Sequence, residues 1–228
     1  MHLEVLTEDK SGGVVLDCLL QKILDRRLPH TYSFSIRPHR GKGYPPDNLW
    51  KKPNRFASGL LDLLPAKMRA YAASYRPDQL MVLIVMDSDA DAPQAVYGKL
   101  DQIVRQFGKD LPTVIGISVE EMESWLLGDP EAILAAYPDA DLGKAGKYVQ
   151  DSVCGTWEIL ASVLAGHQAE HIIRIGYPAV GQIKNEWARL IAPYLEPGRN
   201  RSPSFQRFHR LLLHNLRVLE ERKVRPHV

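Results

Sequence analysis

The sequence predicts an α/β protein whose mostly parallel, Rossmann-like sheet carries helices on both faces and is followed by a C-terminal helical extension. Short apolar runs alternate with helical patterns through residue 137, which is typical of a parallel sheet built from strand–helix units. The run Leu80 to Met86 is bounded by polar residues and is typical of a strand buried on both faces. From about residue 150 onward, apolar residues recur at helical spacing only.

Periodicity and turn residues set the extent of each element. We expect strands over residues 2–6, 31–36, 80–86 and 112–119. We expect helices over residues 14–28, 55–75, 93–107, 131–137, 157–165, 181–195 and 205–222. Residues 1–137 should form the Rossmann-like α/β core, and residues 138–228 a helical extension packed on it as one compact unit.

Composition places the chain among soluble globular proteins. Of its 228 residues, 45% are hydrophobic and 25% are charged, and no apolar run approaches the length of a membrane span. Cys18 and Cys154 stand far apart in apolar contexts, so we expect them to be reduced and the protein to be cytoplasmic. No His/Cys cluster has the spacing of a zinc site.

Three acidic side chains follow the ends of two predicted strands. Glu8 follows the first strand, and Asp87 and Asp89 follow the central strand. Ligands of open α/β sheets bind beside the carboxyl ends of the strands, so these carboxylates lie where such folds build sites. Residues two apart on an extended backbone share a face, and like charges there repel unless a cation lies between them. We therefore predict that Glu8, Asp87 and Asp89 bind Mg²⁺ or Mn²⁺, which prefer carboxylate oxygens.

A structural explanation fits some of these acids equally well. Carboxylates near the start of a helix are favoured by the helix dipole, and Glu8 taken alone has this explanation. Asp91 precedes Ala92-Pro93, so we predict that Asp91 is the N-cap of the next helix.

Further acids follow the fourth predicted strand, in Glu120-Glu121-Met122-Glu123. Glu120 and Glu123 would share a helix face, while Glu121 falls elsewhere, and any of them can stabilise a helix start without taking part in chemistry. We name Glu121 and Glu123 as candidate catalytic residues. Lys42 and Lys184 are candidate cations for the charge that develops on a phosphate group.

Basic residues are concentrated in two segments, although the net charge is only +2. Residues 37–55 contain six Lys or Arg against one acid, and residues 199–228 contain eight against two. Such segments suit phosphate backbones, although solvated surfaces look the same. We predict that both segments border the acids and bind nucleic-acid backbone through Arg40, Lys42, Arg199, Asn200, Arg201 and Ser202. The alternative is that residues 202–204 only begin the last helix, with Ser204 as N-cap.

A Glu after the first strand and an Asp-x-Asp after a later strand resemble the TOPRIM domain of topoisomerases, primases and the overcoming-lysogenization-defect nucleases. The residues that match are Glu8, Asp87 and Asp89. Neither the topoisomerase tyrosine nor the primase zinc ligands can be identified in this sequence.

Three other runs carry a more specific resemblance. They are Gly41-Lys42-Gly43, residues 121–129 (EMESWLLGD) and residues 200–205 (NRSPSF). With them, nearly the whole chain is similar to a family of bacterial TOPRIM-like proteins known as a domain of unknown function. We expect Trp125, Leu126 and Phe205, the large residues of these runs, to fill the core.

The resemblance implies a TOPRIM-type nuclease that uses Mg²⁺ to cut nucleic acid. Members of that family are often found near ATPases and defence genes, which implies phage defence with an ATPase partner. Two ions held by Glu8, Asp87, Asp89 and one of Glu121 or Glu123 would clamp the attacking and leaving oxygens, with water as the nucleophile. The alternative is a non-catalytic partner or regulatory subunit that keeps the fold.

Overall fold

The computed structural model describes residues 1–27, 32–176 and 178–224, with side chains through residue 221. Leu28 and Thr31, predicted to end a helix and begin a strand, lie outside the described residues, as do the side chains of Arg222 and Lys223 and all of Arg225. The strands are β1 (His2–Thr7), β2 (Ser33–Pro38), β3 (Leu80–Asp87) and β4 (Thr113–Ser118).

These strands form one sheet in the order β2-β1-β3-β4, and every neighbouring pair is parallel. Three helices connect them: α1 (Lys10–Asp25), α2 (Leu60–Ser74) and α3 (Pro93–Phe107). From β1 the chain continues to β2, toward one edge of the sheet, and from β3 it continues to β4, toward the opposite edge. The connections therefore diverge between β1 and β3, which is the switch point where open α/β sheets bind ligands.

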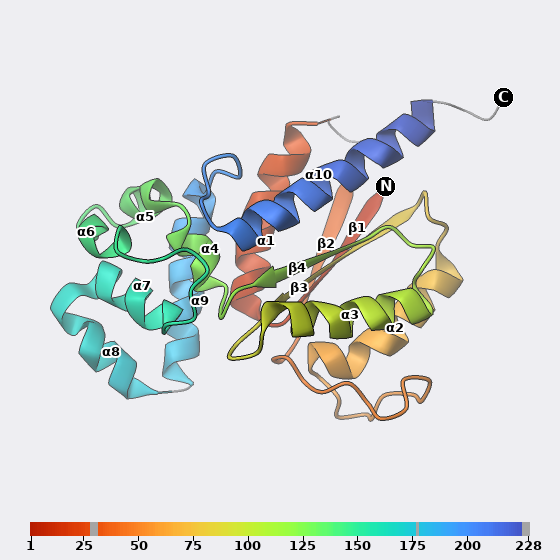
Figure 1. The fold of residues 1–228 in the computed structure, drawn as a ribbon, viewed down its shortest axis with the longest axis horizontal. Helices are drawn as coiled ribbons and strands as arrows, with labels where there is room; N and C mark the ends of the chain where they lie inside the picture. The colour runs from red at the N-terminus through yellow and green to blue at the C-terminus, as the bar shows by residue number, and fades with distance from the viewer. Residues whose placement is uncertain (28–31, 177, 225–228) are drawn as a thin grey trace.

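Helices cover both faces of the sheet, as Figure 1 shows. Alternate residues of β3 face opposite layers. Val82 and Ile84 pack with α2 and α3, whereas Met81 and Leu83 pack with α1 and with α10 (Pro203–Val224). The predicted α/β class, with a parallel sheet between two helical layers and a C-terminal helix, is confirmed.

A group of shorter helices lies beyond the carboxyl end of the sheet, at the left of Figure 1. They are α4 (Glu123–Leu127), α5 (Pro130–Ala136), α6 (Leu142–Ala145), α7 (Thr156–Ala165), α8 (Ala169–Ile175) and α9 (Ala179–Ile191), with 3-10 turns at Gly166–Gln168 and Ala192–Tyr194. One continuous apolar core joins Leu16 and Trp125 to Leu160, Trp187 and Phe208, so it contains residues from both sides of position 137.

Several predicted boundaries shift for local reasons. The predicted helix 93–107 matches α3, but α2 begins at Leu60 instead of residue 55. Gly59 is its N-cap, and the Asp62 carboxylate accepts a hydrogen bond from the Gly59 N–H at 3.0 Å. Two helices, α6 and α8, occur where no helix was predicted, because each is short and its apolar spacing too brief to stand out.

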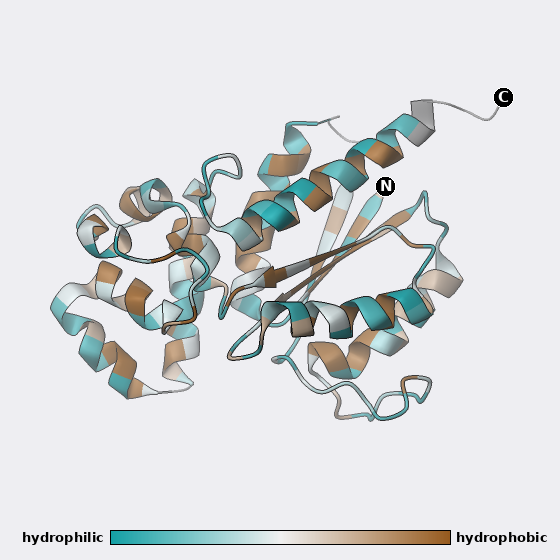
Figure 2. Cartoon of the chain, in the orientation of Figure 1, coloured by the Kyte–Doolittle hydropathy of each residue, from teal (hydrophilic) through white to brown (hydrophobic). Residues whose placement is uncertain are grey.

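Figure 2 shows brown, hydrophobic residues along β3 and β4, whereas the surrounding helices carry both colours. This contrast is expected, because only the strands are covered on both faces. None of the helices in the described ranges combines the length and the apolarity that a membrane span requires.

Candidate functional site: an acidic edge of the sheet

Six acidic side chains gather at or near the carboxyl ends of the strands, and we call them the acidic edge: Glu8, Asp9, Asp87, Asp89, Glu121 and Glu123. They follow β1, β3 and β4. They lie close together because the carboxyl ends of parallel strands meet at the same end of a sheet. The sequence-predicted acids therefore come from three neighbouring strands.

Glu8 and Asp87 meet at the switch point between β1 and β3. Glu8 Oε2 accepts a hydrogen bond from the Asp87 N–H at 3.4 Å. Burial, and then the negative charge of Asp89, raise the pKa of Glu8 to about 7. Burial, and then the charge of Glu8, raise the pKa of Asp87 well above its ordinary value. Ser118 at the end of β4 donates a short hydrogen bond to Asp87 Oδ1.

Asp89 does not share the strand face of Asp87 as predicted. The strand ends at Asp87, and Asp89 has a left-handed backbone with φ of 50°, so the alternation of an extended chain stops between them. The Asp89 carboxylate instead pairs with Lys42 at 2.9 Å, and Lys42 also pairs with Asp91 at 3.1 Å. The prediction that Asp91 caps α3 is wrong, because Ala92 is the N-cap and no side chain caps this helix.

Asp9 is a member of the acidic edge that the sequence analysis missed. It is the N-cap of α1, where its carboxylate accepts hydrogen bonds from the Gly12 N–H at 2.8 Å and from Ser11 Oγ at 2.6 Å. The predicted start of this helix at residue 14 was wrong, because α1 begins at Lys10. An acid three residues before a helical N–H was the missed signal.

The three glutamates after β4 have different roles. Glu120 caps α7, because its carboxylate accepts hydrogen bonds from the N–H groups of Gly155 at 2.9 Å and Thr156 at 2.9 Å. Glu121 and Glu123 instead pair with Lys184 of α9, each at 3.2 Å. Burial raises the pKa of Glu121 to about 7 and raises that of Glu123, although Lys184 opposes both shifts.

The acidic edge thus places carboxylates with raised pKa between two lysines, Lys42 at one end and Lys184 at the other. Within the described ranges, no group of three or more His, Cys, Asp or Glu side chains is arranged so that it could hold a metal ion. Within the acidic edge, the Oε2 atom of Glu121 is buried without a hydrogen-bond partner. The arrangement can take up protons near neutral pH, and it offers carboxylate pairs, rather than a closed set of ligands, to a cation.

Three of the four predicted nucleic-acid residues near position 200 have structural contacts. Arg199 pairs with the fully buried Asp129, at 2.7 Å and 3.0 Å, and with Glu131 at 2.8 Å. Asn200 and Ser202 are buried, so neither side chain can reach a phosphate. Ser202 Oγ accepts from the Phe205 N–H and is the N-terminal cap of α10, so the assignment of that cap to Ser204 is wrong.

The two most distinctive sequence runs interlock in the core. Asn200 Nδ2 donates to the Trp125 carbonyl at 2.7 Å, and Trp125 Nε1 donates to Ser204 Oγ at 2.9 Å. The Trp125 ring lies 5.2 Å from that of Phe205. Both rings are fully buried and Leu126 is almost so, which confirms that these large residues fill the core.

Of the predicted basic residues, Arg40 and Arg201 are exposed. Arg40 lies near the start of the loop between β2 and α2, and the Gly41 N–H next to it donates to the Glu8 carbonyl at 3.0 Å. This contact joins the first basic segment directly to the acidic edge.

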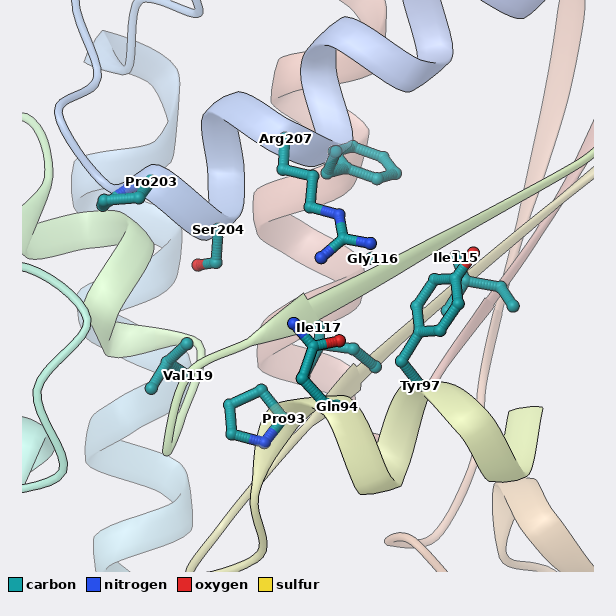
Figure 3. Close-up of a pocket in the computed structure, with 11 residues that line it drawn as sticks. Pro93, Gln94, Tyr97, Ile115, Gly116, Ile117, Val119, Pro203, Ser204 and Arg207 are labelled. Carbon is teal, nitrogen blue, oxygen red and sulfur yellow. The ribbon is translucent and has the colours of Figure 1, made fainter. Parts of the chain in front are cut away.

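A separate cavity of about 290 Å³ lies beside the outer edge of β4, between α3 and α10. Figure 3 shows Arg207 of α10 extending toward β4 above Tyr97 of α3. The Arg207 guanidinium is 5.2 Å from the centre of the Tyr97 ring. No residue of the acidic edge lines this cavity, so it is not part of the candidate site.

A family model matches most of the chain. Residues 7–213 match the family described as "Domain of unknown function (DUF4276)", which includes both the sheet and the helices beyond it. No curated protein and no solved structure matches the chain.

Proposed function

Because the chain belongs to the DUF4276 family, whose description names no activity, we propose a function from the acidic edge: metal-assisted hydrolysis of phosphodiester bonds in nucleic acid. The observation that carries this proposal is the meeting of Glu8 and Asp87 at the switch point of the sheet. The finer assignment, a TOPRIM-type nuclease in phage defence with an ATPase partner, is supported by the motif resemblance alone.

The donors at the switch point suit Mg²⁺ or Mn²⁺ in their chemistry. Glu8 and Asp87 offer hard carboxylate oxygens, and their mutual repulsion would be relieved by a cation between them. A third protein ligand does not join them as the described side chains stand, but Mg²⁺ commonly keeps several waters. A bound ion would supply Lewis-acid chemistry to a phosphate oxygen and to a water.

The other side chains of the site have roles that follow from their contacts. Ser118 orients Asp87 by donating to Oδ1. Lys42 is partly exposed and would exchange its pairing with Asp89 for a phosphate oxygen of the substrate. Glu121, with its unpaired oxygen and a pKa near 7, would accept a proton from the attacking water. Lys184 was a candidate cation for the phosphate charge. It would instead position Glu121, because its ammonium group is buried against that carboxylate.

Metal binding provides the first test. Calorimetric titration with MgCl₂ and MnCl₂ should show binding to the wild type and at least tenfold weaker binding to a Glu8→Gln/Asp87→Asn variant. Asp139→Asn is the matched control, because Asp139 is an exposed acid outside the acidic edge. The same proteins would then be incubated with single-stranded and double-stranded DNA and RNA in each metal. Equal metal binding by all three proteins would contradict the proposal.

One observation favours a second candidate, the non-catalytic partner subunit. Lys42 and Lys184 already pair with three of the six carboxylates of the acidic edge, so part of its negative charge is offset by the protein itself. A partner subunit of this kind needs no metal. It predicts that neither Mg²⁺ nor Mn²⁺ changes the thermal midpoint and that no substrate of the panel is cleaved.

A further inference from the structure

The loop between β2 and α2 presents exposed aromatic rings among cations. We define the stacking loop as residues 40–57, which contain three exposed aromatic side chains and five cations: Tyr44, Trp50, Phe56, Arg40, Lys42, Lys51, Lys52 and Arg55. We propose that this loop binds single-stranded nucleic acid by stacking bases on Tyr44 and Phe56. The inference rests on the proposed function and names the strandedness of its substrate.

The two rings are unusually open for such large side chains. Tyr44 is 85% exposed and Phe56 is 75% exposed, so both rings are open to a flat partner from solvent. The Arg55 guanidinium lies 4.5 Å from the centre of the Phe56 ring and covers one of its faces. The other face can take a base, since aromatic rings and guanidinium planes are the groups on which unpaired bases stack.

Trp50 has a different role, because it ties the loop to the protein. Its ring meets that of Phe107 edge to face at 4.8 Å, and the Arg69 guanidinium lies 5.9 Å from it. Arg69 also donates a short hydrogen bond to the Leu49 carbonyl. The tip of the loop is therefore held against α2 and α3, as the orange segment below these helices in Figure 1.

The start of the loop is held as firmly. Gly43 has φ of 65°, and a Cβ at this position would lie 2.8 Å from the Asp62 carboxylate. That carboxylate accepts from the Tyr44 N–H at 2.9 Å and from the Gly59 N–H at 3.0 Å. Because the start and the tip of the loop are both fixed, little conformational freedom is lost when a ligand binds.

Charge favours a polyanion as the ligand. A hollow of about 580 Å³ is lined by Tyr44 and Asn54, by Lys51 and Lys52, and by two acids, Asp47 and Asp62. The Asp62 carboxylate already accepts from the Tyr44 and Gly59 N–H groups. Asp47 is the one acid within residues 40–57, against five cations. An acidic peptide would satisfy the charges, but it has no flat groups for the two open rings. Bases have such groups, and phosphates suit the lysines.

The strand must be single, because the bases of a duplex are already stacked on one another and cannot cover a side-chain ring. The first residues of the loop also contact the candidate site. Gly41 N–H donates to the Glu8 carbonyl at 3.0 Å, and Lys42 pairs with Asp89. A strand held on the loop would therefore lead toward the acidic edge.

The test is fluorescence anisotropy in EDTA with labelled 12-nucleotide DNA and RNA, single-stranded and as blunt duplexes. The wild type should bind single strands at least about tenfold more tightly than duplexes. A Tyr44→Ala/Phe56→Ala variant should bind single strands roughly 30-fold more weakly, which is the lower end of what two stacked bases contribute. Tyr75→Ala is the matched control, because Tyr75 is exposed but lies outside the loop. It should bind as the wild type does.

A salt series separates rings from charges. A Lys51→Gln/Lys52→Gln variant should lower the slope of log affinity against log salt by about 1.4, whereas the ring variant should keep the wild-type slope. Binding in EDTA does not depend on a metal, so binding without cleavage in Mg²⁺ would contradict the proposed hydrolysis and leave this inference standing. Equal affinity for duplexes, unchanged binding by the ring variant, or equally tight binding of poly-glutamate would overturn it.

Discussion

Replacing Lys184 with Met should destabilise the protein strongly, because two carboxylates would lose their ammonium partner. Lys184 Nζ lies 3.2 Å from Glu121 Oε1 and 3.2 Å from Glu123 Oε2. The Lys184 side chain is 9% exposed and that of Glu123 is 2% exposed. Removal of one partner from a buried pair costs about 3–5 kcal/mol, since the remaining charge stays buried. Methionine has a similar volume, so the loss should be mainly electrostatic.

The cost should depend on pH in a direction set by the two glutamates. Burial raises the pKa of Glu121 to about 7 and raises that of Glu123. An acid whose pKa is higher in the folded state binds more protons when folded. Its ionisation therefore destabilises the fold as the pH rises from about 4.5 to about 7. Lys184 limits this loss of stability, because its positive charge favours the ionised glutamates. Its removal should therefore lower the free energy of unfolding by the full amount of about 3–5 kcal/mol at pH 8 and by clearly less at pH 5.

Urea unfolding at pH 5 and pH 8 measures both quantities. Lys144→Met is the matched control, because Lys144 pairs with Asp141 at 3.8 Å and the two side chains are 44% and 48% exposed. An exposed pair of this kind contributes below about 1 kcal/mol. A loss below about 1 kcal/mol for Lys184→Met at pH 8, or an equal loss at both pH values, would refute the reasoning.

Three further predictions concern single residues. Glu8→Gln should leave the free energy of unfolding in EDTA unchanged near pH 5 and raise it at pH 8. The reason is that the pKa of Glu8 is about 7 and its ionised form is disfavoured by burial; equal effects in urea titrations at the two pH values would count against this. Trp125→Ala should cost about 3–5 kcal/mol, because the ring is fully buried between Phe205 and Phe208, and an unchanged thermal midpoint would contradict it. Gly43→Ala should cost about 1–2 kcal/mol or more in chemical denaturation, because its φ is 65°, whereas Gly198→Ala, with open space around it, should cost little.

The elements that could be predicted from sequence are those with strong local signals. Leu80 to Met86 is apolar without interruption, and it forms the strand buried on both faces. Pro93 and Gly108 mark the ends of α3 directly in the chain. The meeting of Glu8 and Asp87 could also be predicted, because each lies at the carboxyl end of a strand and a parallel sheet brings those ends together whatever loops follow.

The partners of the acids could not be predicted, since they come from distant parts of the chain. Lys184 follows Glu121 by more than 60 positions, and no local pattern relates them. The basic residue Arg199 appeared to suit phosphate, yet its partner Asp129 is a buried acid 70 positions away. Charge patterns identify candidate residues, but only the packed fold determines which opposite charge each one meets.

The position of α10 has a consequence for synthesis on the ribosome. Phe208 of this helix packs directly on Gly116 of β4, where a Cβ would lie 2.8 Å from its ring. Translation proceeds at about 5–20 residues per second, so the interval between completion of β4 and emergence of Leu216 is roughly 5–20 s. During that interval the apolar surface around Val114 lacks its cover. The nascent chain therefore exposes this apolar surface until α10 emerges, and a stop codon near position 203 would leave the fragment permanently without that cover.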